Sequence, residues 1–403
     1  MKHLRTFLSL AAIALILSSC SSDSSGDNPG NQTEQKDGYI TSTTDPDFDP
    51  TDLKGEVTGD IELTANTEYT LTGALNVNEG STLTIDAGTV IKAHADSDAD
   101  RTALYITIEP GAKIMANGTE NDPIIITSDD ANPQPGAWGG LLIAGKARQN
   151  KNDGGTAISE VGDLQYGGNN DEDNSGVIKY VILKYTGSAI NSESEFNGFT
   201  FYAVGSATTV QNVAVMYGAD DAFEFFGGTV NVTNALGVDV KDDIFDWTDG
   251  WRGTATNFYG VREDGFELES EDPRGLEGDS NENNNALTPR SNPTFDGLTL
   301  VNKSNTIAFT DAMKLRRGTD ITVKNALVVL SGTAGASDFI DVTDGKGDAN
   351  SVNLNVYSTG MTIANVHNDA DAPLDLTNVI INGTPMNTGA DASVFAWTGF
   401  KNF

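Results

Sequence analysis

Residues 220–228 read DDAFEFFGG, and residues 242–250 read DDIFDWTDG. Both stretches contain, in the same order, two adjacent aspartates, an aromatic residue, an acid and a second aromatic residue. Both end on glycine. The second copy starts 22 residues after the first. A repeat of this length is typical of a solenoid in which each repeat forms one coil.

Weaker copies of the pattern continue on both sides of this pair. IDAGTVIKA at Ile85 is followed 23 residues later by IEPGAKIMA, and related five-residue stretches begin at Asn197, Asp264, Asp311 and Asp338. Alternating apolar residues between frequent glycine turns favour strands. Together these features predict an all-β fold over residues 56–403, a parallel β-helix solenoid with coils of about 21–25 residues and protruding loops.

The longest interruption of the repeat is ESEDPRGLEGDSNENNNALTPRSNP, residues 269–293. Its Asn, Gly and Pro content suits an exposed loop better than a coil. Functional loops are common on rigid scaffolds. We therefore expect this segment to protrude beside the repeated acids. It would either form part of a partner-binding surface or serve as a capping or spacer loop.

The repeated acids raise a question of charge. Equivalent residues of stacked coils lie about 4.8 Å apart, and carboxylates at this distance repel each other by about 1 kcal/mol or more near a protein surface. Backbone NH groups of the turns, Lys314 or a bound cation could offset the repulsion. Capping of the turns is the simplest interpretation for the column of Asp221, because uncharged Asn197 takes the same position.

Calcium is the cation that this arrangement favours, because Ca²⁺ takes six to eight hard oxygen ligands at about 2.3 to 2.6 Å. The candidate calcium ligands are Asp220, Asp221, Glu224, Asp242, Asp243, Asp246 and Glu267.

The N-terminus has the features of an export signal. Lys2 and Arg5 precede an apolar run from Phe7 to Leu17, which is too short to span a bilayer as a helix. The run ends in LSSC, which resembles the lipobox of bacterial lipoproteins. We expect residues 1–19 to be a lipoprotein signal peptide and Cys20 to be lipidated.

Residues 20–55 contain much Ser, Asp, Gly and Asn and little to bury, so we expect a flexible tether. Asp23 and Asp27 resemble a sparse version of the surface-export signal of Bacteroidota lipoproteins. This likeness implies an outer-membrane lipoprotein that is exposed at the cell surface. Cys20 is the only cysteine, which excludes an intramolecular disulfide.

Several stretches resemble a known family: GAWGGLLIAGKA (136–147), NGTENDPIIITS (117–128), the two doubled-Asp blocks, and GLEGDSNENNNALTPRSNPTF from Gly275. They look like the right-handed parallel β-helix, pectin-lyase-like surface lipoproteins of Bacteroidota and marine bacteria. The resemblance implies a right-handed parallel β-helix, an envelope location and frequent association with TonB-dependent outer-membrane receptors. It implies no catalytic residue.

Charge limits the partners of the chain. The formal net charge is -34, with 58 acidic residues against 24 Lys and Arg. Nucleic acid would be repelled, because no basic stripe offsets this charge. A neutral glycan, a peptide, a divalent cation or another envelope protein remains open as a partner.

Two classes of function fit these features. The favoured one is a non-catalytic binding or receptor-accessory module, and the alternative is a polysaccharide lyase or glycoside hydrolase on a β-helix scaffold. A lyase would combine calcium with a basic residue such as Arg252 or Arg262, whereas a hydrolase would use two of the stacked carboxylates. Trp251 either stacks on a sugar or fills the core. The candidate ligand-binding residues are Trp251, Arg252, Arg262, Glu277, Asp279, Asn283 and Arg290.

Overall fold

The computed structural model describes residues 38–97, 100–151, 155–161, 164–191, 194–266, 272–360, 366–367, 375, 377–381 and 386–403. The predicted signal peptide, the lipidation site Cys20 and the calcium candidate Glu267 lie outside these residues.

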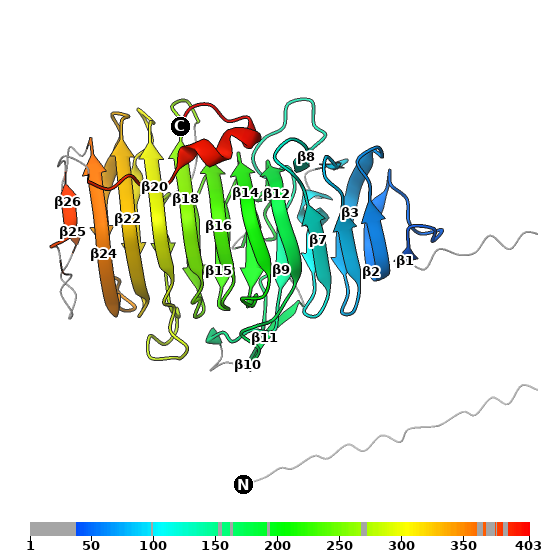
Figure 1. Ribbon diagram of the computed structural model, residues 1–403, viewed down its shortest axis with the longest axis horizontal. Coiled ribbons are helices and arrows are strands. Elements are labelled where there is room, and N and C mark those ends of the chain that lie inside the picture. Colours follow the sequence, from blue (N-terminus) through cyan, green and yellow to red (C-terminus); the bar gives the residue numbers. More distant parts are fainter. Residues whose placement is uncertain are drawn as a thin grey trace, which may run out of the picture. The chain divides into compact units, whose positions relative to one another are not determined.

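Parallel strands stack coil upon coil around one core (Figure 1), and their pairing defines three faces. Face 1 contains β4 (Thr82–Ile85), β7 (Lys113–Asn117) and the first halves of β12 (Gly176–Lys184), β14 (Thr209–Met216), β16 (Asn231–Val238), β18 (Thr254–Arg262), β20 (Thr294–Asn302), β22 (Asp320–Leu330) and β24 (Ser351–Thr359). Face 2 contains β5 (Val90–Ala93), β8 (Ile124–Ser128), the second halves of the same long strands and β26 (Val379–Ile381).

Face 3 is built from short strands. It contains β6 (Ile106–Ile108), β9 (Leu141–Ala144), β13 (Phe199–Tyr202), β15 (Phe223–Phe226), β17 (Phe245–Thr248), β19 (Glu277–Gly278), β21 (Phe309–Leu315), β23 (Ala336–Asp341) and β25 (Val366–His367). Phe223 of β15 pairs with Phe245 of β17, so one coil takes 22 residues here. The prediction of a parallel β-helix is confirmed.

The solenoid begins earlier in the chain than residue 56. Strand β1 (Tyr39–Ser42) pairs in parallel with β2 (Leu53–Leu63), which pairs in turn with β3 (Tyr69–Val77). Residues 37–403 form one compact unit. The last part of the segment whose composition indicated a tether therefore belongs to the fold, because Ile40 and Leu53 are buried in its core.

Aromatic side chains form columns inside the solenoid. Phe201 stacks on Phe225 with ring centroids 5.1 Å apart, and Phe225 stacks on Trp251 at 4.0 Å. All three rings are fully buried. Of the two roles that the sequence allowed for Trp251, the structure shows the core one.

A column of asparagines forms the corner between face 1 and face 2. Asn212, Asn234 and Asn257 have φ values of 54°, 59° and 60°, a left-handed conformation that Asn tolerates better than most residues. Their side-chain amides bond from coil to coil: Asn234 Nδ2 donates to Asn212 Oδ1 at 2.7 Å, and Asn257 Nδ2 donates to Asn234 Oδ1 at 2.9 Å. The ladder fixes the register of the coils at this corner.

The segment 269–293 differs from the exposed loop that its composition indicated. Leu276 bridges to Phe245, and β19 pairs Glu277 with Lys314, so part of the segment forms the face 3 strand of its coil. The repeat had assigned this place to the stretch that starts at Asp264. The residues after β19 leave the stack and return at β20.

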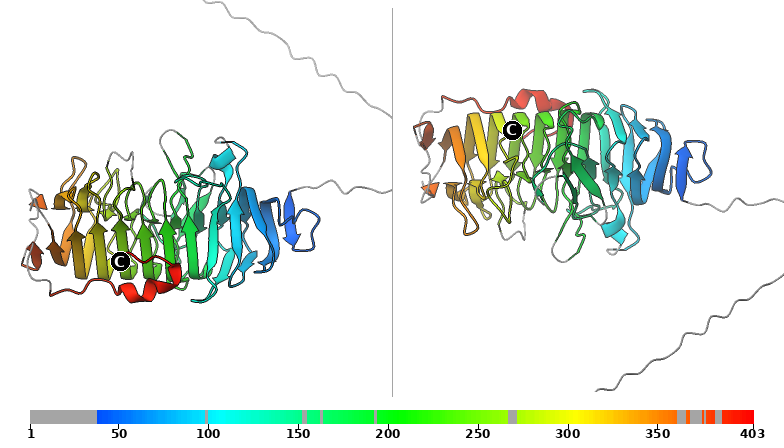
Figure 2. Two further views of the ribbon diagram at one scale, coloured as in Figure 1. Left: turned by 90° about the horizontal axis from the view of Figure 1, so that it is seen from above. Right: turned by 90° about the horizontal axis from the view of Figure 1, so that it is seen from below.

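The C-terminal segment 386–403 folds back over the solenoid. It contains the 3₁₀ helix η3 (Ala392–Thr398), which runs across several strands of face 2 (Figure 2). Phe395 packs against apolar side chains that point outward from this face, among them Met216, Leu236 and Val261. A second short 3₁₀ helix, η1 (Asp100–Ala103), lies between β5 and β6.

Candidate functional site

A hairpin lies on the outside of face 3 and bounds a cleft. Strand β10 (Gly155–Ile158) pairs antiparallel with β11 (Gln165–Gly168). Tyr166 of the hairpin packs on Tyr202 and Phe226 of face 3. Beside it lies a cavity of about 490 Å³, the charged cleft, lined by Lys151, Glu160, Glu224, Phe226, Asp246, Thr248, Asp249, Asp279, Asn281, Glu282, Asn283, Asn284, Leu287, Arg316 and Arg317.

The alternation of a strand explains why carboxylates face this cleft. Phe223 and Phe225 point into the core, so Glu224 between them points outward. Asp246 is the register partner of Glu224 on the next coil. The repeated acid at this position of the sequence thus becomes part of the cleft lining.

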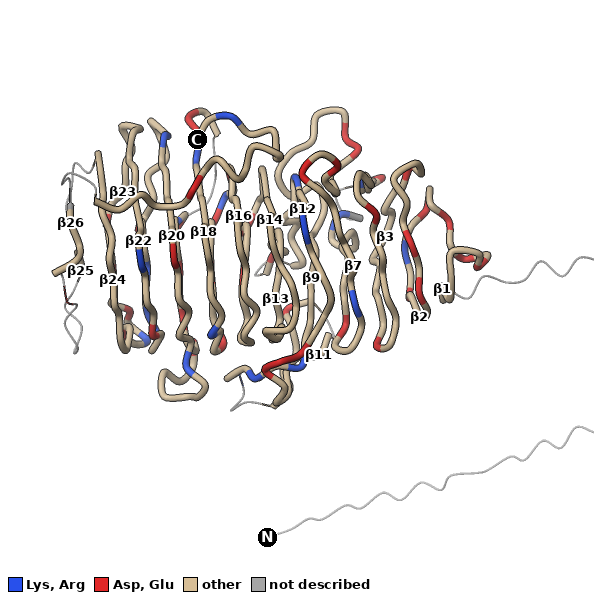
Figure 3. Tube along the Cα trace, in the orientation of Figure 1, with Lys and Arg blue, Asp and Glu red and all other residues tan. Residues whose placement is uncertain are grey.

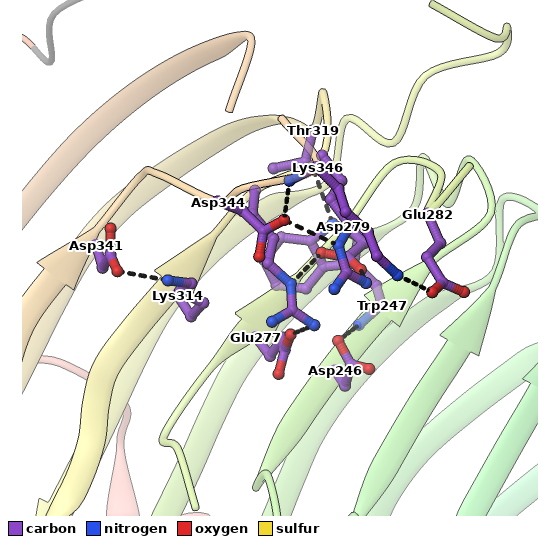
Figure 4. A network of polar contacts seen from close by, with 12 residues as sticks. Asp246, Trp247, Glu277, Asp279, Glu282, Lys314, Thr319, Asp341, Asp344 and Lys346 are labelled. Carbon is purple, nitrogen blue, oxygen red and sulfur yellow. Dashed lines mark hydrogen bonds and ion pairs between the residues drawn. The ribbon is translucent and has the colours of Figure 1, made fainter. Parts of the chain in front are cut away.

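Arg316 and Arg317, which directly follow β21, also line the cleft. Figure 4 shows two of their acidic partners, Glu277 and Asp279, near Asp246. Arg316 Nε donates to Asp279 Oδ1 at 2.8 Å, and Arg317 Nη1 donates to Asp279 Oδ2 at 2.7 Å. Arg316 also pairs with Glu277, which is buried. Six acidic and three basic residues thus line the cleft. Figure 3 shows that both acidic and basic positions occur along the chain near β11.

The ladder of turn aspartates is capped mainly by the backbone. Asp221 Oδ1 accepts from the Asp243 NH at 2.8 Å, and Asp243 Oδ1 accepts from the Arg274 NH at 2.8 Å. Each carboxylate thus accepts a hydrogen bond from the backbone NH of the residue at the equivalent position of the next coil. Arg274, rather than an acid, occupies the rung after Asp243, and its Nε donates to Asp311 Oδ2 at 3.1 Å.

Two groups of acids remain close together. Carboxylate oxygens of Asp220, Asp221 and Asp242 lie within 4.8 Å of one another, and the same holds for Asp221, Glu224 and Asp246. Burial raises the pKa of Asp221 and of Glu224 well above the usual carboxyl range, and the neighbouring carboxylates raise it further. At neutral pH these groups need either protons or a cation.

Two further carboxyls of the cleft have shifted acidity. Burial raises the pKa of Asp249 to about 6, although its hydrogen bond from the Tyr166 hydroxyl, 3.1 Å long, acts in the opposite direction. Burial, helped by Asp246, raises the pKa of Asp279 to about 7 despite its arginine partners. Both groups thus change charge near neutral pH.

Two of the seven predicted ligand-binding residues line the charged cleft, Asp279 and Asn283. Glu277 lies beneath it in ion pairs with Arg274 and Arg316.

The remaining candidates lie elsewhere. Trp251 is in the core, and Arg252 donates to both carboxylate oxygens of Asp171, at 3.0 and 3.1 Å. Arg262 is buried with its guanidinium 5.0 Å from the centre of the Phe309 ring. Arg290 donates to the Gly318 carbonyl at 3.0 Å and lines a different cavity.

No pattern in the sequence pointed to Glu160, which lies in the turn of the hairpin between β10 and β11 and lines the cleft. The sequence did contain a signal for Arg316 and Arg317. They directly follow the aligned stretch from Asp311 to Leu315, at the end of strand β21.

Comparisons with known proteins agree with the architecture. The family described as pectate-lyase like beta helix domain matches residues 55–399. A search of curated proteins and a search of solved structures each found no match. Within the described part of the chain, no helix has the length and apolar character needed to cross a membrane. Since the family match covers most of the sequence, the chain belongs to the family of proteins with a pectate-lyase-like β-helix domain.

Proposed function

We propose that the chain is a lipid-anchored surface protein that binds a neutral oligosaccharide in the charged cleft, without modifying it. The observation that carries this proposal is the lining of the cleft, which combines carboxylates, arginines, side-chain amides and a hydroxyl in one cavity of about 490 Å³. Sugar hydroxyls both donate and accept hydrogen bonds, so they match a surface of this mixed kind.

The charge of the cleft favours an uncharged ligand. Six acidic residues and three basic ones line it, and the whole chain has a formal net charge of -34. A polyanion would meet repulsion both at long range and in the cleft. Two of the three basic residues, Arg316 and Arg317, already pair with Asp279.

Binding to an array of neutral oligosaccharides, followed by calorimetry on the best ligand, tests the proposal. Asn283 is exposed in the cleft, and we expect Asn283→Ala to weaken binding at least about tenfold, the effect of one lost hydrogen bond to a polar ligand. The matched control is Asn292→Ala, an exposed asparagine outside the cleft, which should leave affinity within about twofold. Absence of binding to every neutral glycan, or equal loss in both variants, would contradict the proposal.

The anchor is the second part of the proposal. It is supported by the stretch LSSC at residues 17–20 and by the apolar run before it. We expect the protein to fractionate with the outer membrane and to be accessible to protease added to intact cells. A Cys20→Ser variant should lose fatty-acid labelling and leave the membrane fraction; label that persists in this variant would exclude lipidation at Cys20.

We further propose a TonB-dependent receptor as the envelope partner, on the strength of the sequence resemblance alone. Affinity purification of the anchored protein from detergent-solubilised envelopes should recover such a receptor. Recovery of the anchored protein without any receptor would remove this partner while leaving the glycan proposal intact.

One observation favours a second candidate function, a glycoside hydrolase. Glu224 and Asp246 are adjacent carboxyls in the cleft, and the raised pKa of Glu224 would keep it protonated as a general acid must be. Incubation of the bound glycan with the protein, followed by a reducing-end assay, separates the two functions. Product formation that Glu224→Gln abolishes would support the hydrolase, whereas stable binding without products supports the binding module.

A further inference from the structure

Three carboxylates meet where β15 and β17 begin. Asp221 belongs to the turn before β15, Glu224 lies within β15, and Asp246 is its register partner in β17. Each contributes an oxygen to a group whose members lie within 4.8 Å of one another. We refer to these three residues as the acid cluster.

Among the described residues, the charges that act most strongly on Asp221 and Glu224 are those of other acids. The charged groups that act most strongly on Asp221 are Asp220, Asp246, Glu224 and Asp242, all of them acids. Those that act on Glu224 are also acids, including Glu160 from the hairpin. Arg316 and Arg274 act on Asp246 from the side of the following coil, where they are already shared with Glu277.

An independent observation concerns the uncharged rung of the ladder. Asn197 is only 4% exposed, and its Nδ2 donates to Glu224 Oε2, so its amide lies against the acid cluster. The other atom of this amide, Oδ1, is buried and has no hydrogen-bond partner. A buried carbonyl oxygen without a partner is uncommon in folded proteins, and a bound ion is one arrangement that would satisfy it.

We propose that the acid cluster binds one Ca²⁺ ion, held by Asp221, Glu224, Asp246 and the side-chain oxygen of Asn197. Three carboxylates supply more than the two negative charges that the ion neutralises, and all four side chains offer hard oxygen atoms. Calcium accepts irregular sets of oxygen ligands and bidentate carboxylates, whereas Mg²⁺ requires a near-octahedral shell and keeps most of its water.

The neighbouring group of Asp220, Asp221 and Asp242 is a weaker candidate. It shares Asp221 with the acid cluster, but the buried oxygen without a partner belongs to Asn197, which bonds to Glu224. The ion would therefore lie toward Glu224 and the cleft. This inference does not rest on the proposed glycan, since binding of the ion can be measured with no glycan present.

The test uses the mature chain, stripped with a chelator and passed into metal-free buffer at pH 7. Calorimetric titration with CaCl₂ should show one site per chain, and 1 mM CaCl₂ should raise the melting temperature by several degrees. The same concentration of MgCl₂ should raise it less. If CaCl₂ gives neither binding heat nor a shift, the carboxylates hold protons instead and the proposal is overturned.

Two isosteric variants locate the ion. Asp221→Asn and Glu224→Gln should each weaken calcium binding at least tenfold, and Asn197→Ala should weaken it as well. The matched control is Asp296→Asn, which removes one exposed carboxylate from β20, far from these residues in the coil register. If Asp221→Asn fails to fold, Glu224→Gln still decides: an unchanged affinity in that variant would place the ion elsewhere and refute the assignment.

Discussion

Arg274 solves the charge problem of the aspartate ladder at one rung. It is 6% exposed, it donates to Asp311, and it pairs with Glu277 on the same strand segment. Its backbone NH also caps Asp243. A single guanidinium thus offsets the charges of acids from three consecutive coils, because its planar donors reach several carboxylates at once.

Replacing this guanidinium should be costly. Arg274→Met removes the guanidinium that pairs with buried Asp311 and one of the two that pair with buried Glu277, and we expect the free energy of unfolding to fall by about 3–5 kcal/mol. Urea denaturation measures it. Lys324→Met, which removes an exposed positive charge from β22, should change stability by less than about 1 kcal/mol. Similar losses in both variants would show that net charge, not the buried pairing, dominates.

The raised carboxyl pKa values predict how stability depends on pH. Asp249 has a pKa of about 6 in the fold against an ordinary value of 3.8, so the folded protein binds a proton that the unfolded chain has released. The resulting stabilisation is complete below about pH 4 and is lost as the pH rises through about 6, or through about 7 for Asp279.

We therefore expect the free energy of unfolding in chelator to fall between pH 5 and pH 7.5, and Asp249→Asn to reduce that fall. A shift of about two units corresponds to at most about 3 kcal/mol. The asparagine can still accept from Tyr166, and Asp296→Asn serves as the control. A steeper fall in Asp249→Asn, or a rise in stability toward pH 7.5 in the parent, would contradict the assigned direction.

At the scale of the element, variants of the asparagine corner can separate two contributions to stability: the side-chain hydrogen bonds and the left-handed backbone conformation. Asn234→Gly keeps the left-handed backbone at φ 59° but removes two side-chain hydrogen bonds, which should cost about 1–2 kcal/mol. Asn234→Val removes the same bonds and adds strain, for a further 1–2 kcal/mol or so. Thermal unfolding of the pair measures the difference, and equal stability of the two variants would mean that the φ value carries no cost here.

The register of one strand shows where sequence reasoning failed. Both DGFEL from Asp264 and RGLEG from Arg274 fit the repeat, and the shorter spacing favoured the first. Val238 and Val261 are equivalent in the stack, yet Phe245 follows Val238 by seven residues whereas Phe266 follows Val261 by only five. The turn from face 2 to face 3 cannot be closed two residues early, so the chain takes Leu276 instead.

For the whole molecule, the coil repeat and the columns of acids could be predicted because they follow from a constant period. The walls of the cleft could not. Asn281 donates to the Asn150 carbonyl at 3.2 Å, and Tyr166 donates to Asp249, contacts that join segments far apart in the chain. A sequence repeat does not predict such contacts, because they depend on where two loops of different coils meet.

The net charge leads to a prediction for the molecule as a whole. With a formal charge of -34, the acidic residues of the folded chain repel one another. The Debye length, which is the distance over which this repulsion acts, is about 30 Å at 0.01 M salt but only about 8 Å at 0.15 M. We expect the melting temperature to rise by a few degrees between 10 and 150 mM NaCl. A neutral osmolyte at equal osmolarity is the control, and a melting temperature that falls with NaCl would contradict the expectation.

The C-terminal segment also sets an order of events during biosynthesis. It bonds to middle coils, where Asn257 accepts from the Asp391 NH and Lys303 donates to the Asn402 carbonyl, yet the ribosome makes it after all of them. Until it arrives, the apolar strip with Leu236 and Val261 has no cover. Until then the nascent chain exposes an apolar surface that is prone to aggregation, and a chaperone that shields β-rich surfaces would act at that stage.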